Sequence, residues 1–132
     1  MNFLFKEEPG NYSYDAFLKD KRTTWTGVRN AVAQKHLRSV KKGDRIFYYH
    51  TGDEKAVVGI AKAVKNAYLD KSGEGHVVDI VPVKRLRRPV TLAEIKKDRR
   101  FAHLPLVRVP RLSVMPIDDE SWDAIIKMSG TT

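Results

Sequence analysis

A predicted β-hairpin near the middle of the chain constrains the fold most strongly. Residues 45–50 and 57–68 are rich in β-branched and aromatic side chains, and Thr51-Gly52-Asp53-Glu54 between them has the composition of a hairpin connection. Two further strands are predicted, a short buried one over 2–6 and a long one over 76–86 with interleaved polar and apolar residues. Strands joined by hairpins predict a closed or nearly closed antiparallel barrel and argue against a doubly wound parallel sheet.

Capping residues predict four helices around this sheet. In each case a side chain can accept hydrogen bonds from the free N–H groups of the first helical turn. The predicted helices are 14–19 after Ser13, 31–40 after Asn30, 92–98 with a capping box of Thr91 and Glu94, and an acidic C-terminal helix after Asp118. The second helix places Val32, Leu37 and Val40 close to one face, and the last one turns Trp122, Ile125 and Ile126 inward. With segment 105–115 predicted to be extended, the fold class is α+β, a mostly antiparallel β-barrel with peripheral helices.

Composition limits the classes of protein to which the chain can belong. Its 132 residues have the length of one domain, and 42% hydrophobic residues are enough for a compact core, which excludes wholesale disorder. The lack of cysteine excludes disulfides, thiolate metal sites, iron–sulfur clusters and a cysteine nucleophile. Apolar runs reach only a few residues, so we predict no membrane segment and no signal peptide. We expect a soluble cytoplasmic monomer without membrane association.

The charge of the chain is strongly basic and unevenly distributed. Lysine and arginine number 25 against 16 acidic residues, which gives a formal net charge of +9. Two basic clusters, 29–45 and 84–111, hold most of this charge, whereas 112–132 is acidic. Such clusters favour an anionic partner, although a solvated surface is the alternative for any single side chain. We expect contacts with a nucleic-acid backbone from Lys35, Arg38, Lys41, Lys42, Arg85, Arg87 and Arg88.

The sequence lacks the common catalytic and cofactor motifs. Its eight glycines form neither G-x-x-x-x-G-K nor G-x-G-x-x-G, which removes the main support for nucleotide hydrolysis and dinucleotide chemistry. The four histidines are far apart without metal-ligand spacing, and no serine lies in a nucleophile elbow. Glu7 and Glu8 are adjacent and therefore face opposite ways on an extended strand, which makes them a poor acid–base pair. We expect no metal, no cofactor and no catalytic residue.

Two aromatic segments contain the residue types of a base-binding site. In Thr24-Trp25-Thr26-Gly27-Val28-Arg29-Asn30, a tryptophan and a glycine precede a helix, with an arginine and an asparagine beside them. The alternative for a loop tryptophan is a plug of the core. In Phe47-Tyr48-Tyr49-His50, alternation sends Tyr48 and His50 to one face and the other pair to the opposite face, so one pair is core and the other is free to line a cleft. Aromatic walls hold a base by stacking, at about 1–3 kcal/mol per base.

An ordered set of motifs along nearly the whole chain resembles the EVE domain family. The resemblance implies a single domain over 1–132 with the PUA-like fold, a small β-barrel with peripheral helices. The sequence departs from the family at Phe3, where a tryptophan is usual, and at Glu7, where a serine is usual. The matching motifs are Phe3-Leu4-Phe5-Lys6-Glu7-Glu8-Pro9, Tyr12-Ser13-Tyr14-Asp15, Trp25-Thr26-Gly27-Val28-Arg29-Asn30, Leu37-Arg38, Gly43-Asp44, Tyr49-His50, Val58-Gly59-Ile60-Ala61, Arg88-Pro89-Val90-Thr91-Leu92 and Arg111-Leu112-Ser113-Val114.

The resemblance also implies a function and a site. Family members are thought to bind nucleic acid that carries modified bases, with the base flipped into an aromatic pocket. If Glu7 faces this pocket, its carboxylate favours a positively charged or hydrogen-bond-donating base edge over a phosphate. Carried onto this sequence, the pocket draws on Lys6, Glu8, Pro9, Trp25, Gly27, Val28, Arg29, Asn30, Tyr49, His50 and Ser113.

Together these features predict a non-enzymatic reader of modified bases, such as 5-methylcytosine, in DNA or RNA. The basic clusters would attract the backbone, and Trp25, Asn30 and the Glu8 region would hold the extruded base. The alternative is a hydrolase or other enzyme that acts on a small nucleoside-like molecule in the same pocket, with Glu8, His50 and Lys6 as acid–base candidates. A third hypothesis is a protein-interaction module whose acidic C-terminal helix meets a basic partner.

Overall fold

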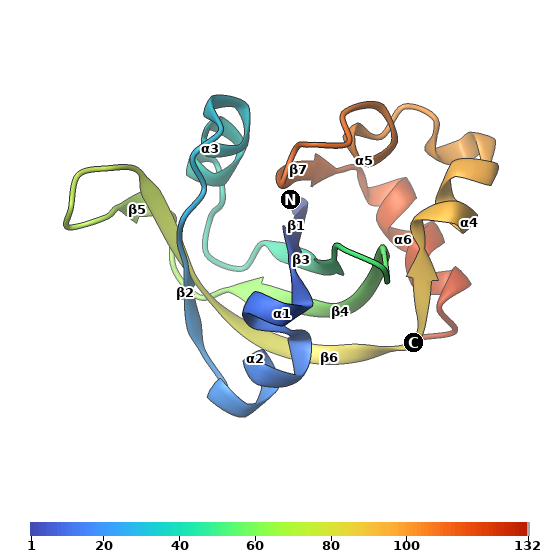
Figure 1. The fold of residues 1–132 in the computed structure, drawn as a ribbon, viewed down its shortest axis with the longest axis horizontal. Helices are drawn as coiled ribbons and strands as arrows, with labels where there is room; N and C mark the ends of the chain where they lie inside the picture. Colours follow the sequence, from blue (N-terminus) through green and yellow to red (C-terminus); the bar gives the residue numbers. More distant parts are fainter. Residues whose placement is uncertain (132) are drawn as a thin grey trace.

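The chain folds around one curled mixed sheet with helices at its edges and on its faces (Figure 1). We describe residues 1–131 from a computed structural model. The strand order is β2-β6-β4-β3-β1-β7, and β5 pairs with β6 outside this path. The strands are β1 (Asn2–Glu7), β2 (Thr23–Trp25), β3 (Arg45–His50), β4 (Ala56–Ala63), β5 (Tyr68–Leu69), β6 (His76–Thr91) and β7 (Val114–Ile117).

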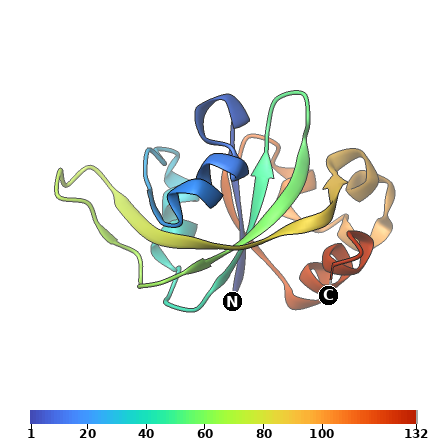
Figure 2. The same ribbon diagram turned by 90° about the horizontal axis from the view of Figure 1, so that it is seen from below.

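The sheet is a half-barrel, which confirms the predicted α+β class. The central strands β1 and β3 pair in parallel, and β1 pairs with β7, β3 with β4, and β4 with β6 in antiparallel fashion. The strand order ends at β2 and β7, so the curl stays open between these two edges. Figure 2 shows β6 following the curl along the length of the molecule. The parallel pair is a non-local feature, because three helices and β2 lie between β1 and β3 in the chain.

The capping predictions are confirmed. The side chains of Ser13, Asn30, Thr91 and Asp118 all accept hydrogen bonds from the first turn of their helices, and Thr91 and Glu94 form a complete capping box. Figure 1 shows α4, α5 and α6 gathered at one end of the sheet, with the β5–β6 hairpin projecting at the other. The helices are α1 (Pro9–Tyr12), α2 (Tyr14–Asp20), α3 (Ala31–Arg38), α4 (Leu92–Lys97), α5 (Pro105–Arg108) and α6 (Asp119–Met128), and a 3-10 turn η1 covers Arg99–Phe101.

Three strand predictions are corrected by the structure. The strand predicted over 57–68 ends at Ala63, and the chain resumes as β5 to form a second hairpin with β6. The strand predicted to end at Leu86 continues to Thr91. The register with β4 shifts between Arg85 and Val90, so Pro89 lies in an irregular stretch where its lack of a backbone N–H costs no hydrogen bond of the ladder. The segment 105–115 was expected to be extended, but Pro105 begins the short helix α5, since proline is favoured in the first helical turn.

Aromatic side chains fill both faces of the central strands. On one face Phe47 stacks on Trp122 of α6 with ring centroids 3.6 Å apart. On the other face Tyr48 contacts Tyr14 and Phe17 of α2. The inward prediction holds for Trp122 and Ile125, while Ile126 is partly buried.

The face predicted for the helix over 31–40 is corrected at one position. Ala33 is buried there with Leu37 and Val40, while Val32 is 52% exposed. Among residues 1–131, none of the helices is both long enough and apolar enough to cross a membrane.

Candidate nucleic-acid interface

The strand register divides the predicted site between two faces of the sheet. Phe5 pairs with Tyr48, Lys6 with Tyr49, and Glu7 with His50 in the parallel β1–β3 ladder. Side chains alternate along a strand, so the first and third pairs share one face and the second pair lies on the other. We call the first set, together with Trp25, the aromatic face: Phe5, Glu7, Trp25, Tyr48 and His50.

Trp25 is a core residue of the aromatic face. It lies in β2, which pairs with β6, and only 6% of its surface is exposed. Its ring centroid is 5.3 Å from that of Phe5 and 5.4 Å from that of Tyr48, in tilted and edge-on contacts. The loop placement predicted for Trp25 is therefore wrong, because Thr23–Trp25, a segment of only three residues, pairs with β6 as a strand.

Glu7 lies on the aromatic face, at the end of β1. Its side chain is half-buried, and its Oε1 accepts a hydrogen bond from the backbone N–H of Glu8 at 2.8 Å. The Tyr48 hydroxyl donates a short hydrogen bond to the carbonyl of Tyr12. Burial, and next the charge of Glu7, raise the pKa of Tyr48 well above its usual value, so this phenol stays protonated. The aromatic face thus carries one carboxylate beside a neutral phenol.

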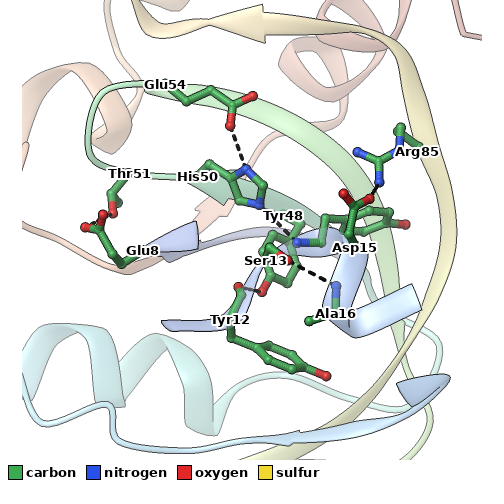
Figure 3. Close-up of polar contacts among 11 residues, drawn as sticks. Glu8, Tyr12, Ser13, Asp15, Ala16, Tyr48, His50, Thr51, Glu54 and Arg85 are labelled. Carbon is green, nitrogen blue, oxygen red and sulfur yellow. Dashed lines mark hydrogen bonds and ion pairs between the residues drawn. The ribbon is translucent and has the colours of Figure 1, made fainter. Parts of the chain in front are cut away.

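His50 holds α2 on β3 through a hydrogen bond to the α2 backbone (Figure 3). The N–H of Tyr14 donates to His50 Nε2 at 3.0 Å, which leaves the ring proton on Nδ1, facing Glu54 Oε1 at 2.7 Å. The side chain is 7% exposed. Since both nitrogens have partners, His50 positions the α2 backbone and has no nitrogen left for a base edge. This placement differs from the direct contact predicted for it.

The loop after Trp25 lines a shallow cleft of about 180 Å³ against the β5–β6 hairpin. Thr26, Gly27 and Arg29 are exposed there, and Gly27 has a positive φ of 76°, which suits glycine. The side-chain amide of Gln34 fastens the loop, because it donates to the carbonyl of Val28 at 2.7 Å and to that of His76 at 3.1 Å. Thr26 to Arg29 are thus brought together as one surface.

Asn30 has a different partner from the base edge predicted for it. Its Oδ1 accepts from the N–H groups of Val32 and Ala33, both at 3.0 Å, and so caps α3. The acceptor predicted to read a base is therefore occupied within the helix.

A buried carboxylate anchors the strand that carries Trp25. Asp79 of β6 accepts hydrogen bonds from Thr24 at 2.9 Å, from Tyr68 at 2.7 Å and from Arg22 at 2.9 Å. Burial alone would raise the pKa of Asp79, but these three hydrogen bonds outweigh it and hold the pKa below its ordinary value. Asp79 therefore links β2, β5 and β6 and fixes the position of the aromatic face.

Lys6 and Tyr49 lie on the opposite face, away from Trp25. The ammonium of Lys6 is 5.6 Å from the centre of the Tyr49 ring and donates to the carbonyl of Pro110 at 2.8 Å. Ser113 is next to them, because its carbonyl accepts from the N–H of Lys6 at 2.9 Å. The lysine cleft on this face has a volume of about 240 Å³ and is lined by Lys6, Tyr49, Thr51, Gly52, Lys55, Leu92, Lys96, Leu106 and Pro110.

Glu8 and Pro9 occupy the rim between the two faces. Glu8 is exposed and accepts from the Thr51 hydroxyl at 3.2 Å, while Pro9 is the first residue of α1 (Figure 3). The three acid–base candidates therefore do not converge on one point: Lys6 faces the lysine cleft, Glu8 lies at the rim, and His50 is buried with both nitrogens occupied. Within residues 1–131, no group of three histidine, aspartate or glutamate side chains could hold a metal ion.

The side chains predicted to contact a nucleic-acid backbone are all exposed, but two of them, Arg85 and Arg88, also bind other residues of the chain. Lys35, Arg38, Lys41, Lys42 and Arg87 are exposed. Arg85 forms an ion pair with Asp15 and lies 5.4 Å from the centre of the Tyr14 ring (Figure 3). Arg88 donates to Glu94 and to the carbonyl of Met128, both at 2.9 Å, so its guanidinium ties β6 to α4 and α6.

Sequence reasoning missed four residues that shape the two faces. Gln34 and Asp79 act through hydrogen bonds across 42 and 55 residues of chain, which no local pattern announces. Lys55 and Lys96 come together in the lysine cleft from the β3–β4 turn and from α4. A signal existed for these two lysines, since Lys55 directly follows the predicted hairpin connection and Lys96 belongs to the basic cluster 84–111.

Comparisons with known proteins agree with this arrangement. A solved protein of Rhodopseudomonas palustris superposes with a TM-score of 0.92 at 41% identity, over 98% of this chain and 92% of that one. The structure of the human THYN1 protein in complex with 5-methylcytosine-containing DNA superposes with a TM-score of 0.89 at 25% identity, over 99% and 98% of the two chains. Thymocyte nuclear protein 1 of Gallus gallus is 30% identical over 83% of this chain.

The fold defines a PUA-like domain, a curled half-barrel with a few helices. The EVE domain model matches residues 1–128, and the chain belongs to the EVE domain family. The chain spans 56% of the length of the Gallus gallus relative and 63% of its human counterpart.

Proposed function

We propose that this chain is a non-enzymatic DNA-binding domain that recognises 5-methylcytosine, with the base extruded from the duplex toward the aromatic face. The observation that carries the proposal is the likeness to human THYN1, whose structure was solved with 5-methylcytosine-containing DNA and superposes over nearly the whole of both chains. The charge of +9 supports an anionic partner. Exposed lysines of the 29–45 cluster are suited to the backbone phosphates.

Glu7 is the group on the aromatic face best suited to read the base edge. One of its carboxylate oxygens accepts from Glu8, and the other is available to a donor. Cytosine and 5-methylcytosine both present a 4-amino group, for which a carboxylate is the matching acceptor. Thymine carries a carbonyl at the same position and would be repelled. Glu7 therefore selects cytosine, while the methyl group is selected by contact with apolar and aromatic atoms.

Access to the aromatic face requires local opening of the packing around Trp25, which keeps only 6% of its surface exposed. Tyr48 on this face is packed against Tyr14 and Phe17 of α2. The base therefore reaches the indole when the side chains around it move apart. Extruding a base costs a few kcal/mol, and stacking of about 1–3 kcal/mol together with edge hydrogen bonds offsets this cost.

A binding role fits the side-chain geometry better than a catalytic one. Neither nitrogen of His50 is available for proton transfer, and Lys6 is on the other face of the sheet. A general acid or base must come within hydrogen-bond reach of the reacting atom. Incubation of the protein with 5-methyldeoxycytidine should therefore yield no product by chromatography.

The test is the affinity of the protein for short duplexes that differ only in one methyl group, measured by fluorescence anisotropy over a salt series. We expect at least tenfold tighter binding of the methylated duplex, and a logarithmic affinity that falls linearly with the logarithm of salt concentration. Equal affinity for both duplexes would leave a basic DNA-binding domain and remove the reader function. Absence of binding at low salt would remove both.

Two sets of variants separate base recognition from backbone binding. Glu7→Ala should reduce the preference for the methylated duplex over one with thymine at that position about tenfold or more, without changing the salt slope. Lys41→Ala with Lys42→Ala should lower the salt slope by up to about 1.8, at about 0.9 per lost phosphate contact, and weaken all duplexes equally. Lys19→Ala with Lys62→Ala removes the same charge outside the basic clusters and is the matched control.

A further inference from the structure

The lysine cleft is a second concave site, separated from the aromatic face by the thickness of the sheet. Five segments build it: the end of β1, the end of β3, the β3–β4 turn, α4, and the stretch from α5 toward β7. It holds Lys6 and Tyr49, which sequence reasoning had grouped with Trp25. Because the base proposed above enters from the other face, the function of this cleft is still to be explained.

The charge of the cleft is positive. Three of its lining residues are lysines, Lys6, Lys55 and Lys96, and none is acidic. The carboxylate of Glu8 lies at the rim, where it accepts from the hydroxyl of the lining residue Thr51 at 3.2 Å. The cleft beside α6 is of mixed charge, since Asp118, Glu120 and Asp123 line it together with Arg100 and Lys127. An anion is therefore directed to the lysine cleft among these concave sites.

Lys6 is the deepest of the three cations. Its ammonium has three N–H donors, and the described contacts account for one of them, to the carbonyl of Pro110 at 2.8 Å. Burial lowers the pKa of Lys6 because the charged form loses hydration. An anion in the cleft would replace the lost hydration and would accept hydrogen bonds from the remaining N–H groups of the ammonium.

The other two lysines are fixed relative to each other by the backbone. Lys55 has a positive φ of 45°, which is unusual for a residue with a side chain, and its carbonyl accepts from the N–H of Leu92 at 2.8 Å. This hydrogen bond joins the β3–β4 turn to the start of α4, the helix that carries Lys96. The mouth of the cleft therefore has two exposed cations on connected elements, above the half-buried Lys6.

The floor of the cleft is apolar and aromatic. Tyr49 is 2% exposed, and burial raises its pKa to about 12, so its ring is neutral at physiological pH. Leu92, Leu106 and Pro110 complete the wall. At about 240 Å³ the cleft is smaller than the roughly 300–1,000 Å³ sites that enclose drug-sized ligands. It fits one small unit with an anionic end and a less polar body.

We propose that the lysine cleft binds the phosphate of a single nucleotide unit, with Lys6, Lys55 and Lys96 around the phosphate and the sugar against Tyr49 and Leu106. The phosphate has two possible sources, the backbone of a bound DNA strand or a free nucleotide. The first source rests on the proposed function, and the second does not. In either case Lys6 and Tyr49 bind phosphate and sugar and do not contact the recognised base.

The experiment uses the whole chain and follows amide chemical shifts by NMR during titration with deoxycytidine 5′-monophosphate. The same titration with deoxycytidine, which lacks the phosphate, is the ligand control. Shifts should appear at Thr51, Gly52, Lys55 and Lys96 with the nucleotide alone. The double variant Lys55→Ala with Lys96→Ala should weaken the nucleotide at least tenfold, whereas Lys19→Ala with Lys62→Ala, which removes the same charge elsewhere, should not.

A second arm measures DNA affinity of the same variants and distinguishes the two sources. The backbone source is supported if the Lys55 and Lys96 variant loses more DNA affinity than the matched control, for methylated and unmethylated duplexes alike. This result supports the backbone source even where the mononucleotide binds too weakly to detect. Mononucleotide binding without any DNA binding supports the free-nucleotide source and contradicts the proposed function alone. Equal shifts with deoxycytidine, or no effect of the double variant on either ligand, would overturn the proposal.

Discussion

The two faces of β1 and β3 are built in different ways. On the aromatic face every ring contacts another ring: Trp25 packs on Phe5 and Tyr48, and Tyr48 packs on His50 and on α2. In the lysine cleft the cations of Lys55 and Lys96 belong to exposed side chains at the ends of elements. The aromatic face is part of the core, so the proposed recognition role would fall on residues that also stabilise the fold, whereas the exposed lysines of the cleft contribute charge and little packing.

The largest effect should come from the aromatic face. Trp25→Ala leaves a cavity beside Phe5 and Tyr48 and should lower the free energy of unfolding by about 3–5 kcal/mol, measured by urea denaturation. Trp25→Phe retains one ring and should cost clearly less. An alanine variant as stable as the parent protein would show that Trp25 is not part of the core, and that the two faces do not differ as described.

Substitution of Gly59 tests how closely the side chains pack on the aromatic face. A Cβ added at Gly59 would collide with the ring of Tyr14, which is fully buried and donates its hydroxyl to the carbonyl of Ile60 at 2.7 Å. Gly59→Ala should therefore cost about 1–3 kcal/mol of unfolding free energy. Gly10→Ala is the matched control, because nothing lies within 4 Å of its added Cβ. Equal stability of the two variants would contradict close packing at Tyr14.

Low pH should reduce the stability of the fold, because protonation of Asp79 weakens the hydrogen bonds that anchor β2. The pKa of Asp79 is depressed in the folded state, so its contribution to stability is present above its ordinary value of 3.8 and is lost as the pH falls through the lower folded value. Asp79→Asn should lower the unfolding free energy at neutral pH by about 1–2 kcal/mol and flatten the acid side of the stability profile. The profile is obtained from urea unfolding at several pH values. An unchanged acid limb would show that Asp79 does not anchor β2.

The smallest effect on stability should come from the lysine cleft. Lys55→Ala with Lys96→Ala removes two exposed side chains and should change the unfolding free energy by less than about 0.5 kcal/mol per site. Calorimetry compared with Lys19→Ala plus Lys62→Ala checks this. A loss of unfolding free energy as large as that from Gly59→Ala would show that the cleft is coupled to the core. It would contradict the difference described between the two faces.

Local signals in the sequence predicted the parts of the fold that local physics determines. Ser13, Asn30, Thr91 and Asp118 begin their helices as predicted, because a capping side chain and the N–H group that donates to it lie within three residues. The β3–β4 hairpin follows from its turn composition in the same way. Thr23–Trp25 was missed as a strand, because its structure comes from pairing with β6 across 55 residues of chain. The helix that begins at Pro105 was missed, because the whole segment 105–115 was predicted to be extended, whereas Pro105 occupies the first helical turn.

The candidate site was predicted in its residue types but not in its geometry. The resemblance to the EVE family supplied the residues, and alternation along Phe47–His50 correctly separated the two faces. It did not reveal that both pairs are buried, with Tyr49 flooring a cleft and His50 binding the α2 backbone. Such outcomes depend on which helix covers each face. For the same reason, Lys96 approaches Lys6 only after α4 docks at the end of the sheet.

The most direct test of separate recognition and phosphate binding on the two faces is the ratio of affinities for a methylated duplex and for the same duplex with thymine in place of the modified base. We expect Glu7→Ala to collapse this ratio toward one with an unchanged melting temperature, and Lys55→Ala with Lys96→Ala to weaken both duplexes while preserving the ratio. A ratio that survives Glu7→Ala, or that changes in the lysine variant, would contradict the division of the site between the aromatic face and the lysine cleft.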